Sequence, residues 1–199
     1  MANVDRPNGL KPVRYQNGNP YNGAHNLYFA PTGSTSAIFI GDVVTLTGNQ
    51  AAAGTNFFGT DVAGMPEVAA FVASDGLPLG VVVGVYPNPD RLGTTHRLAS
   101  TASIIMVADA PDLIFEVQES TGTAFTATMT GLNADLVVGT GNATTGTSDT
   151  ELDVSVTPLT TTLTVRLLRL VPRPDNALGA NARWEVKFVE HSGISATGI

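Results

Sequence analysis

Apolar and polar residues alternate along several parts of the chain, a pattern that is typical of half-buried β-strands. The stretches LIFEVQ (113–118), LDVSV (152–156) and WEVKF (184–188) each place an apolar residue at every second position. Glu116 lies on the polar side of the first stretch, and we expect it to be solvated. The run LPLGVVVGVY (77–86) is apolar almost throughout and predicts a buried strand.

Further strands are expected wherever β-branched and apolar residues stand between turn residues. Gly41 and Asp42 mark a bend between two short strands in 34–48, and Gly80 and Gly84 mark bends or close approaches of the backbone. The stretch 49–66 is expected to be a loop, and the other predicted strands lie in 66–74, 102–108, 124–130, 136–139 and 162–171. No stretch has the period of an amphipathic helix. About ten short strands, spaced by about 8–15 residues, predict an all-β barrel or sandwich with little or no helix.

The composition agrees with one folded domain and an additional arm. The chain has 199 residues, of which 43% are hydrophobic and 14% are charged. This hydrophobic share excludes wholesale disorder. The charged share is well below the roughly 25% that is usual in soluble domains, so part of the surface would be hidden in an interface or covered by small polar residues. We predict an extended N-terminal arm over 1–31, a β-barrel or sandwich domain over 32–190 and a C-terminal tail over 191–199.

The predicted arm combines turn residues with basic and aromatic side chains, a mixture that is unusual for a disordered tail. Its basic residues are Arg6, Lys11 and Arg14, and its aromatic residues are Tyr15, Tyr21, Tyr28 and Phe29. Such a segment cannot build a core of its own, so its aromatic side chains would anchor on another surface. The arm could fold back on its own barrel. The interpretation we favour is that it wraps a neighbouring subunit or another component of an assembly.

Charge is distributed unevenly over the chain, whose formal net charge is −7 and whose pI is about 4.7. Every charged residue in 16–89 and 98–165 is acidic, whereas the basic residues lie in the arm, at Arg91 and Arg97, and in 166–187. This distribution predicts contacts between the basic ends of one chain and the acidic body of a neighbour. We expect no nucleic-acid site, which would need a clustered basic face and a high pI.

No motif in the sequence points to catalysis, a metal or a cofactor. The chain has no cysteine, which excludes disulfides and thiolate chemistry. The acidic residues Asp109, Asp112, Glu116 and Glu119 could bind Ca²⁺ or act as a carboxylate pair, but the first two suit turn capping better. We therefore expect no enzyme.

The remaining candidate residues have structural interpretations. His25, His96 and His191 are scattered, and we expect them at the surface or in an interface. The stretch GTGNATTG (139–146) lacks the Lys-Ser/Thr ending of a phosphate-binding loop and predicts a flexible hairpin loop. The aromatic residues expected in the core are Phe39, Phe115, Trp184 and Phe188. The first residues lack the apolar core of a signal peptide, and no apolar run reaches the ~18 residues of a membrane helix.

Five phrases, taken in order, carry a family resemblance. They are RPNGLKPVRYQNGNPYNGAHNLYFAP, AIFIGDVV, LGVVVGVYPNPDRLGTTHRLASTASIIMVADAPDLIFEVQES, GLNADLVVGTGNATTGTSDTELD and RLVPRPDNALGANARWEVKFVEH. Together they resemble tailed-bacteriophage virion proteins of the capsid decoration, or cement, type. The resemblance covers most of the chain and rests on turn and strand patterns, so it carries over no catalytic residue.

The resemblance implies a structural virion protein on the outer capsid surface, made in the host cytoplasm and binding neither nucleic acid nor membrane. It would be a homo-oligomer, a trimer with exchanged N-terminal arms, that cements neighbouring subunits of the major capsid protein and stabilises the expanded shell. Arg6, Lys11 and Arg14 would then meet acidic surfaces, while the aromatic residues of the arm anchor it.

Two other classes of function stay open. A receptor- or glycan-binding module of a phage fibre or spike would need an exposed aromatic platform or a metal site among its loops. The single Trp, at position 184, lies on a regular alternating strand, which counts against this class. A small barrel enzyme of the cupin or esterase type would need metal-ligand spacing or a nucleophile signature, and the sequence has neither.

Overall fold

The structure, a computed structural model that describes residues 3–72 and 77–195, is built almost entirely of short strands. This confirms the predicted all-β class. The strands are β1 (Lys11–Tyr15), β2 (Asn26–Ala30), β3 (Val43–Gln50), β4 (Asn56–Phe57), β5 (Thr60–Asp61), β6 (Pro66–Ala70), β7 (Gly80–Val85), β8 (Ser103–Ala108), β9 (Leu113–Gln118), β10 (Asn133–Ala134), β11 (Leu136–Val137), β12 (Glu151–Leu152), β13 (Val165–Leu170) and β14 (Arg183–Phe188). The described part of the chain also forms two single-turn 3₁₀-helices, η1 (Pro89–Arg91) and η2 (Ala127–Met129).

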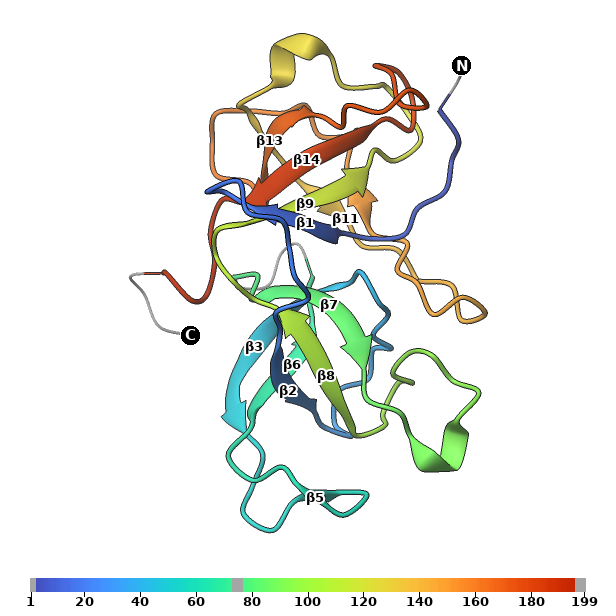
Figure 1. Ribbon diagram of the computed structural model, residues 1–199, viewed down its shortest axis with the longest axis vertical. Coiled ribbons are helices and arrows are strands. Elements are labelled where there is room, and N and C mark those ends of the chain that lie inside the picture. Colours follow the sequence, from blue (N-terminus) through green and yellow to red (C-terminus); the bar gives the residue numbers. More distant parts are fainter. Residues whose placement is uncertain (1–2, 73–76, 196–199) are drawn as a thin grey trace.

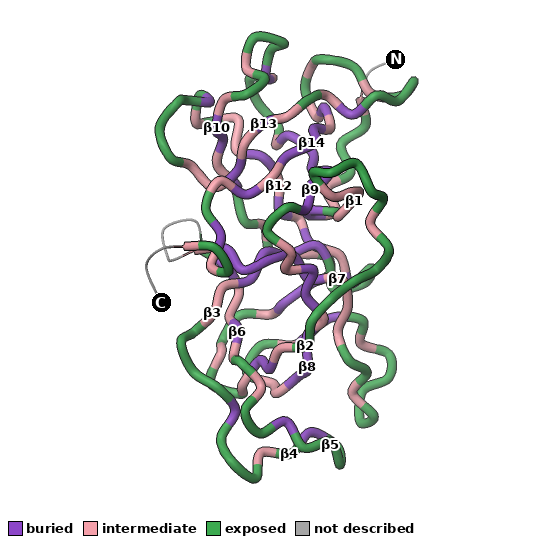
Figure 2. The backbone as a smooth tube through the Cα atoms, turned by 60° about the vertical axis from the view of Figure 1, so that its left-hand side comes forward, coloured by how far each residue is buried: buried purple, intermediate pink, exposed green. Residues whose placement is uncertain are grey.

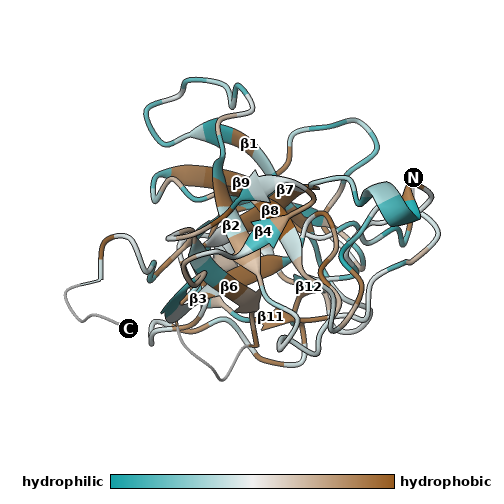
Figure 3. Ribbon diagram, turned by 90° about the horizontal axis from the view of Figure 1, so that it is seen from below, coloured by the Kyte–Doolittle hydropathy of each residue, from teal (hydrophilic) through white to brown (hydrophobic). Residues whose placement is uncertain are grey.

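Most strands belong to a five-stranded sheet or to a small closed barrel, which lie one above the other in Figure 1. The sheet is antiparallel in the order β1-β9-β14-β13-β10, and the barrel has the order β2-β6-β3-β7-β8. Strand β8 of the barrel leads into β9 of the sheet through the predicted turn at 109–112. Figure 3 views the molecule from below and shows hydrophobic residues on the barrel strands, with the β4-β5 hairpin in front of them.

The N-terminal segment belongs to both bodies, which corrects the prediction of a separate arm over 1–31. Strand β1 pairs with β9 at the edge of the sheet, and β2 pairs with β8 and β6 in the barrel wall. Leu10 and Phe29 are almost fully buried. The segment therefore supplies strands and core side chains to the fold, and residue 31 is no domain boundary. The predicted domain over 32–190 likewise divides between the sheet and the barrel.

The predicted C-terminal tail over 191–199 begins inside the fold. His191 is buried, and the amide of Ser192 donates a hydrogen bond to the carbonyl of Pro78 at 3.0 Å. Residues 196–199 lie outside the described residues. The start of the tail is therefore held against the loop that precedes β7.

Several predicted strands are shorter than expected or absent. The stretch 124–130 forms η2, in which no residue is buried, and only Leu152 of the stretch 152–156 lies in a strand. The predicted loop 49–66 contains the β4-β5 hairpin. The strand predicted over 66–74 is observed as β6, and its last two residues lie outside the described part. A strand persists where alternate side chains reach a core, whereas in the Thr-rich stretch 124–130 only Phe125 is buried.

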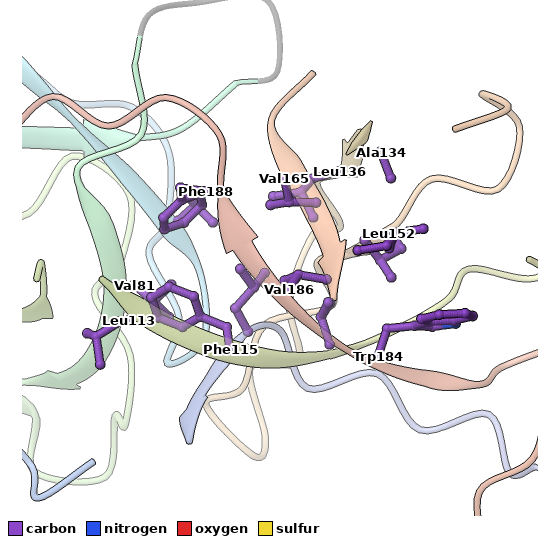
Figure 4. Packing of buried hydrophobic residues seen from close by; sticks show 14 of the residues in the cluster. Val81, Leu113, Phe115, Ala134, Leu136, Leu152, Val165, Trp184, Val186 and Phe188 are labelled. Carbon is purple, nitrogen blue, oxygen red and sulfur yellow. The ribbon is translucent and has the colours of Figure 1, made fainter. Parts of the chain in front are cut away.

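One hydrophobic core joins the sheet to the barrel. Val81 and Ala108 of the barrel belong to the same buried cluster as Leu113, Phe115 and Phe188 of the sheet side. Figure 4 shows Val81 beside Leu113, Phe115 and Phe188 where the two bodies meet. The rings of Phe115 and Phe188 are 5.2 Å apart. In Figure 2 buried residues run through the middle of the molecule, where sheet meets barrel. The four aromatic residues predicted in the core, Phe39, Phe115, Trp184 and Phe188, are all buried.

Gly80 confirms the predicted close approach of the backbone. A Cβ atom at this position would lie 2.4 Å from the carbonyl oxygen of Ala108 in the neighbouring strand. We expect Gly80→Ala to lower the free energy of unfolding by about 2 kcal/mol, because the backbone must shift. Urea denaturation measures the loss. Gly93→Ala is the control, since its Cβ would meet nothing within 4 Å, and equal losses in the two variants would contradict the explanation.

Glu119 is a carboxyl group buried in the core on the sheet side, with 0% exposure. The indole Nε1 of Trp184 donates to its Oε1 at 2.5 Å, while its Oε2 has no hydrogen-bond partner among the described residues. Burial raises the pKa of Glu119 to about 7, although the hydrogen bond from Trp184 opposes the rise. Between pH 4.5 and about 7 the carboxyl group of Glu119 is therefore protonated in the folded protein and ionised in the unfolded chain.

This difference predicts that the stability falls as the pH rises from about 4.5 to about 7, because the folded state binds more protons in this range. Glu119→Gln cannot ionise at this position. The free energy of unfolding of the variant minus that of the wild type should therefore be about 1–3 kcal/mol greater at pH 8 than at pH 5. Urea midpoints, followed by the fluorescence of the single Trp, give both curves. Parallel pH curves for variant and wild type would rule the explanation out.

Candidate interaction face

The register of the strands places basic side chains on the outer face of the five-stranded sheet. On β9, Phe115 points to the core, so its neighbour Glu116 points the other way. Lys11 of β1 and Glu185 of β14 lie directly opposite Glu116, and Arg169 of β13 lies opposite Glu185. Residues directly opposite one another share a face of the sheet. Lys11 and Arg169 therefore emerge on the same side, away from the core.

Other basic residues extend this surface. By the same register Arg14, Arg166, Arg183 and Lys187 also lie on the outer side. Arg173 reaches this side through its ion pair with Glu116, and Arg6 lines the same pocket as Lys11 and Arg183. We call these residues the basic face: Arg6, Lys11, Arg14, Arg166, Arg169, Arg173, Arg183 and Lys187. They are eight of the ten Lys and Arg residues of the chain, all ten of which lie in the described residues. An acidic protein thus gathers most of its positive charge on one surface.

The two remaining basic residues belong to the barrel side of the molecule. Arg97 is 1% exposed and donates hydrogen bonds to backbone carbonyls, among them those of Pro31 and Thr101, so it has a structural role. Arg91 is exposed on η1, and its side chain has no partner among the described residues. Neither residue adds to the basic face.

The pairing of strands unites two segments that are far apart in the sequence. In the sequence, the basic residues of the N-terminal segment and those of 166–187 lie near opposite ends of the chain. Strand β9 pairs with β1 on one side and with β14 on the other, which merges them. The clustered face meets one of the two conditions for nucleic-acid binding, while the acidic pI of about 4.7 does not meet the other.

Glu116 and Glu185 are acidic side chains set into the basic face. Both are buried, 9% and 6% exposed, so the prediction that Glu116 is solvated is wrong. Two carboxylates directly opposite each other would repel. Arginine side chains on either side compensate this repulsion: Arg14 and Arg169 lie 2.6 and 2.7 Å from the carboxylate of Glu185, and Arg173 and Arg183 lie 2.9 and 3.4 Å from that of Glu116.

The ion pairs keep Glu185 charged. Burial alone would raise the pKa of Glu185, but the hydrogen bonds from Arg169 and Arg14 outweigh burial and lower it. A buried carboxylate in this state holds its arginines in fixed positions, since removing either partner leaves a poorly solvated charge. The middle of the basic face is therefore a rigid surface.

The four aromatic residues of the N-terminal segment contact their own chain, as in the alternative in which this segment folds back. The rings of Tyr15 and Tyr21 lie 6.4 Å apart beside the sheet. The hydroxyl of Tyr28 donates to Asp109 Oδ2 at 2.5 Å, and Phe29 is buried at the base of the β4-β5 hairpin. Asp109, which was expected to cap its turn, also accepts from the side-chain amide of Asn26 and so joins β2 to the turn after β8.

Two of the three histidines are not at the surface, contrary to expectation. His96 is 9% exposed and stacks on Phe39 with ring centroids 4.4 Å apart, and His191 is 3% exposed. His25 is exposed as predicted. Burial lowers the pKa of both His96 and His191, which favours the neutral ring in each case.

Within residues 3–72 and 77–195, no group of three or more His, Asp or Glu side chains is placed to hold a metal ion. The same residues include no helix that is long and apolar enough to cross a membrane. The chain matches no family model, no curated protein and no solved structure. The basic face is the arrangement in the described part that we take as the candidate site.

We expect Glu185→Gln to lower the free energy of unfolding by about 1–3 kcal/mol at pH 7, because Arg14 and Arg169 lose their shared counter-charge. Since the pKa of Glu185 is lowered in the folded state, its contribution is present above the unfolded value of 4.5 and is lost at lower pH. The gap between variant and wild type should therefore shrink as the pH falls.

Urea denaturation at a series of pH values tests this. Asp175→Asn is the matched control, because Asp175 is 73% exposed and its contact with Arg173 is longer, at 3.4 Å. It should change the stability little. A gap for Glu185→Gln that stays constant down to acidic pH would argue against the ion pairs as its source.

Proposed function

We propose that the protein is a structural virion protein that binds the outer surface of a bacteriophage capsid through its basic face and cements neighbouring major capsid subunits. The observation that carries this proposal is the basic face itself, which gathers eight of ten basic residues on a chain of net charge −7. An acidic patch on a partner surface would steer and orient the protein on approach. The resemblance of the sequence to capsid decoration proteins supports the same function.

The proposed action is mechanical. A protein that binds the assembled, expanded lattice but not its dissociated subunits stabilises that lattice by mass action. In a homotrimer, three copies of the basic face would bind together, so weak contacts at each would add up to slow release. The basic face replaces the free arm as the proposed element of contact, because β1 and β2 are built into the fold.

One observation favours a second candidate, a receptor- or glycan-binding module of a fibre or spike. Phe58 is 50% exposed at the tip of the β4-β5 hairpin, and Tyr86 nearby is 42% exposed. Phe57 links them, with ring centroids 4.9 Å from Phe58 and 6.5 Å from Tyr86. Phe58 has a φ of 47° and Gly59 a φ of 88°, as a two-residue hairpin turn requires, so the turn holds the Phe58 side chain at the tip. Binding on a glycan array that is lost in Phe58→Ala would support this candidate.

The copy number of the chain in purified virions, relative to the major capsid protein, tests the proposed function directly. A near-stoichiometric number is expected of a cement protein. A handful of copies per virion would favour the fibre or spike candidate instead, and the absence of the chain from virions would reject both.

Charge reversal tests the role of the basic face. Lys11 and Lys187 have no side-chain partner among the described residues, and Gln in place of Lys11 avoids a third carboxylate opposite Glu116, so Lys11→Gln with Lys187→Glu should leave the fold intact. We expect this double variant to bind expanded shells at least about tenfold more weakly, in co-sedimentation at moderate salt. Arg91→Glu is the control with the same kind of change at the barrel, and it should stay within about twofold of the wild type. Equal effects of the two would contradict binding through the basic face.

A further inference from the structure

A pocket of about 430 Å³ opens at one end of the basic face. Its lining includes the basic residues Arg6, Lys11, Arg173 and Arg183 and the acidic residues Glu116 and Asp175. The N-terminal segment before β1 forms one wall, and the loop between β13 and β14 forms the other. The size is within the range of sites that hold small ligands or a few residues of a peptide.

The walls of this pocket are held in place by hydrogen bonds. Asn3 donates to the carbonyls of Ala177 and Ala180 and accepts from the Ala177 amide, which ties the N-terminal segment to the opposite loop. Asn176 bonds the backbone of Val171 and Arg183 and closes the base of that loop. The cavity is therefore formed before any partner arrives.

Arg183 is fixed at the floor of the pocket. Its guanidinium donates to Asn8 Oδ1, Glu116 Oε1, the Arg6 carbonyl and Gln118 Oε1, at 2.8 to 3.4 Å. This side chain contributes positive charge but has few donors left. Direct hydrogen bonds to a ligand would come from other residues.

Free donors and one free acceptor remain in the lining. The side chains of Arg6 and Lys11 have no partner among the described residues, and Arg173 uses Nη1 and Nε in its ion pairs, which leaves Nη2. Asn181 Oδ1 is a buried acceptor without a hydrogen-bond partner in the described part of the chain. Asn181 also has a φ of 60°, so the backbone is strained at the residue that presents this acceptor.

We propose that this pocket binds an acidic peptide segment of a protein partner. A carboxylate of the segment would accept from Arg6, Lys11 and Arg173, and a backbone N–H beside it would donate to Asn181 Oδ1 after a rotation of the Asn181 side chain exposes this oxygen to the pocket. The lining favours a peptide over a nucleic-acid backbone, because phosphodiesters carry no donor for Asn181 whereas a peptide carries backbone N–H groups. The inference rests on the proposed function in that it places the contact with the capsid in this pocket.

Isothermal titration of the full-length protein tests the pocket without a capsid. The probe is a blocked five-residue peptide rich in Glu and Asp, and its counterpart with Gln and Asn is the neutral control. We expect the acidic peptide to bind and the neutral one not to bind. Arg6→Gln with Lys11→Gln should weaken binding at least about tenfold, because charged hydrogen bonds are lost while no bond within the fold is broken.

Two further variants separate the pocket from general electrostatics. Lys187→Gln removes a free charge from the basic face outside the pocket and should weaken binding by less than about twofold. Asn181→Gly removes the acceptor and relieves the strained φ, so it should weaken peptide binding at least about threefold while the protein stays as stable as the wild type. Equal effects of Lys187→Gln and the pocket variants would overturn the proposal, as would equal binding of the acidic and neutral peptides.

The outcomes also separate this proposal from the proposed function. Tighter binding of a ten-residue oligothymidylate than of the acidic peptide would reject a peptide ligand in favour of nucleic acid. If the peptide binds as expected but expanded shells do not bind the wild-type protein, the pocket stands and the cement function fails. If shells bind and the peptide does not, the cement function stands and this pocket is not its contact.

Discussion

The apolar contact between the barrel and the inner face of the sheet determines which side chains lie on the outer face of the sheet. Val81 and Ala108 of the barrel share one buried cluster with Phe115 and Phe188 of the sheet. Because successive residues of a strand point to opposite faces, burying one set on the barrel sends the other set outward. The basic face is therefore a consequence of the core, and any shift of register by one residue would exchange the two.

The composition of the basic face suits the binding of carboxylates. Six of its eight residues are Arg, whose planar guanidinium stays charged at all relevant pH values and pairs with a carboxylate through two donors. Glu116 and Glu185 reduce the mutual repulsion of these arginines and hold several of them in place. A partner that offers carboxylates would meet arginine side chains that are already ordered. These side chains would lose less conformational entropy on binding than flexible lysine side chains would.

Sequence periodicity predicted where strands β9 and β14 lie, because alternation is a local signal, but it did not predict that every residue of β9 is buried. Strands β9 and β14 appear where LIFEVQ and WEVKF alternate, and their aromatic residues lie in the core as expected. Periodicity does not show which strands pair. The N-terminal segment and 166–187 come together only through the strand order β1-β9-β14. Glu116 was expected in solvent because its arginine partners lie more than 50 residues away in the sequence. The buried histidines were missed for the same reason.

The route of the N-terminal segment from the sheet to the barrel explains its mixture of turn and aromatic residues. Between β1 and β2 the chain leaves the sheet and enters the barrel, and Gly18 and Gly23, at φ values of 94° and 87°, allow the turns on the way. Tyr28 then fastens the segment to Asp109, at the turn where β8 passes into β9. A segment that joins two bodies needs both kinds of residue. Because this segment is already ordered in the single chain, the proposed contact is a preformed surface and not a flexible arm. A flexible arm would lose conformational entropy on docking, whereas a preformed surface would not.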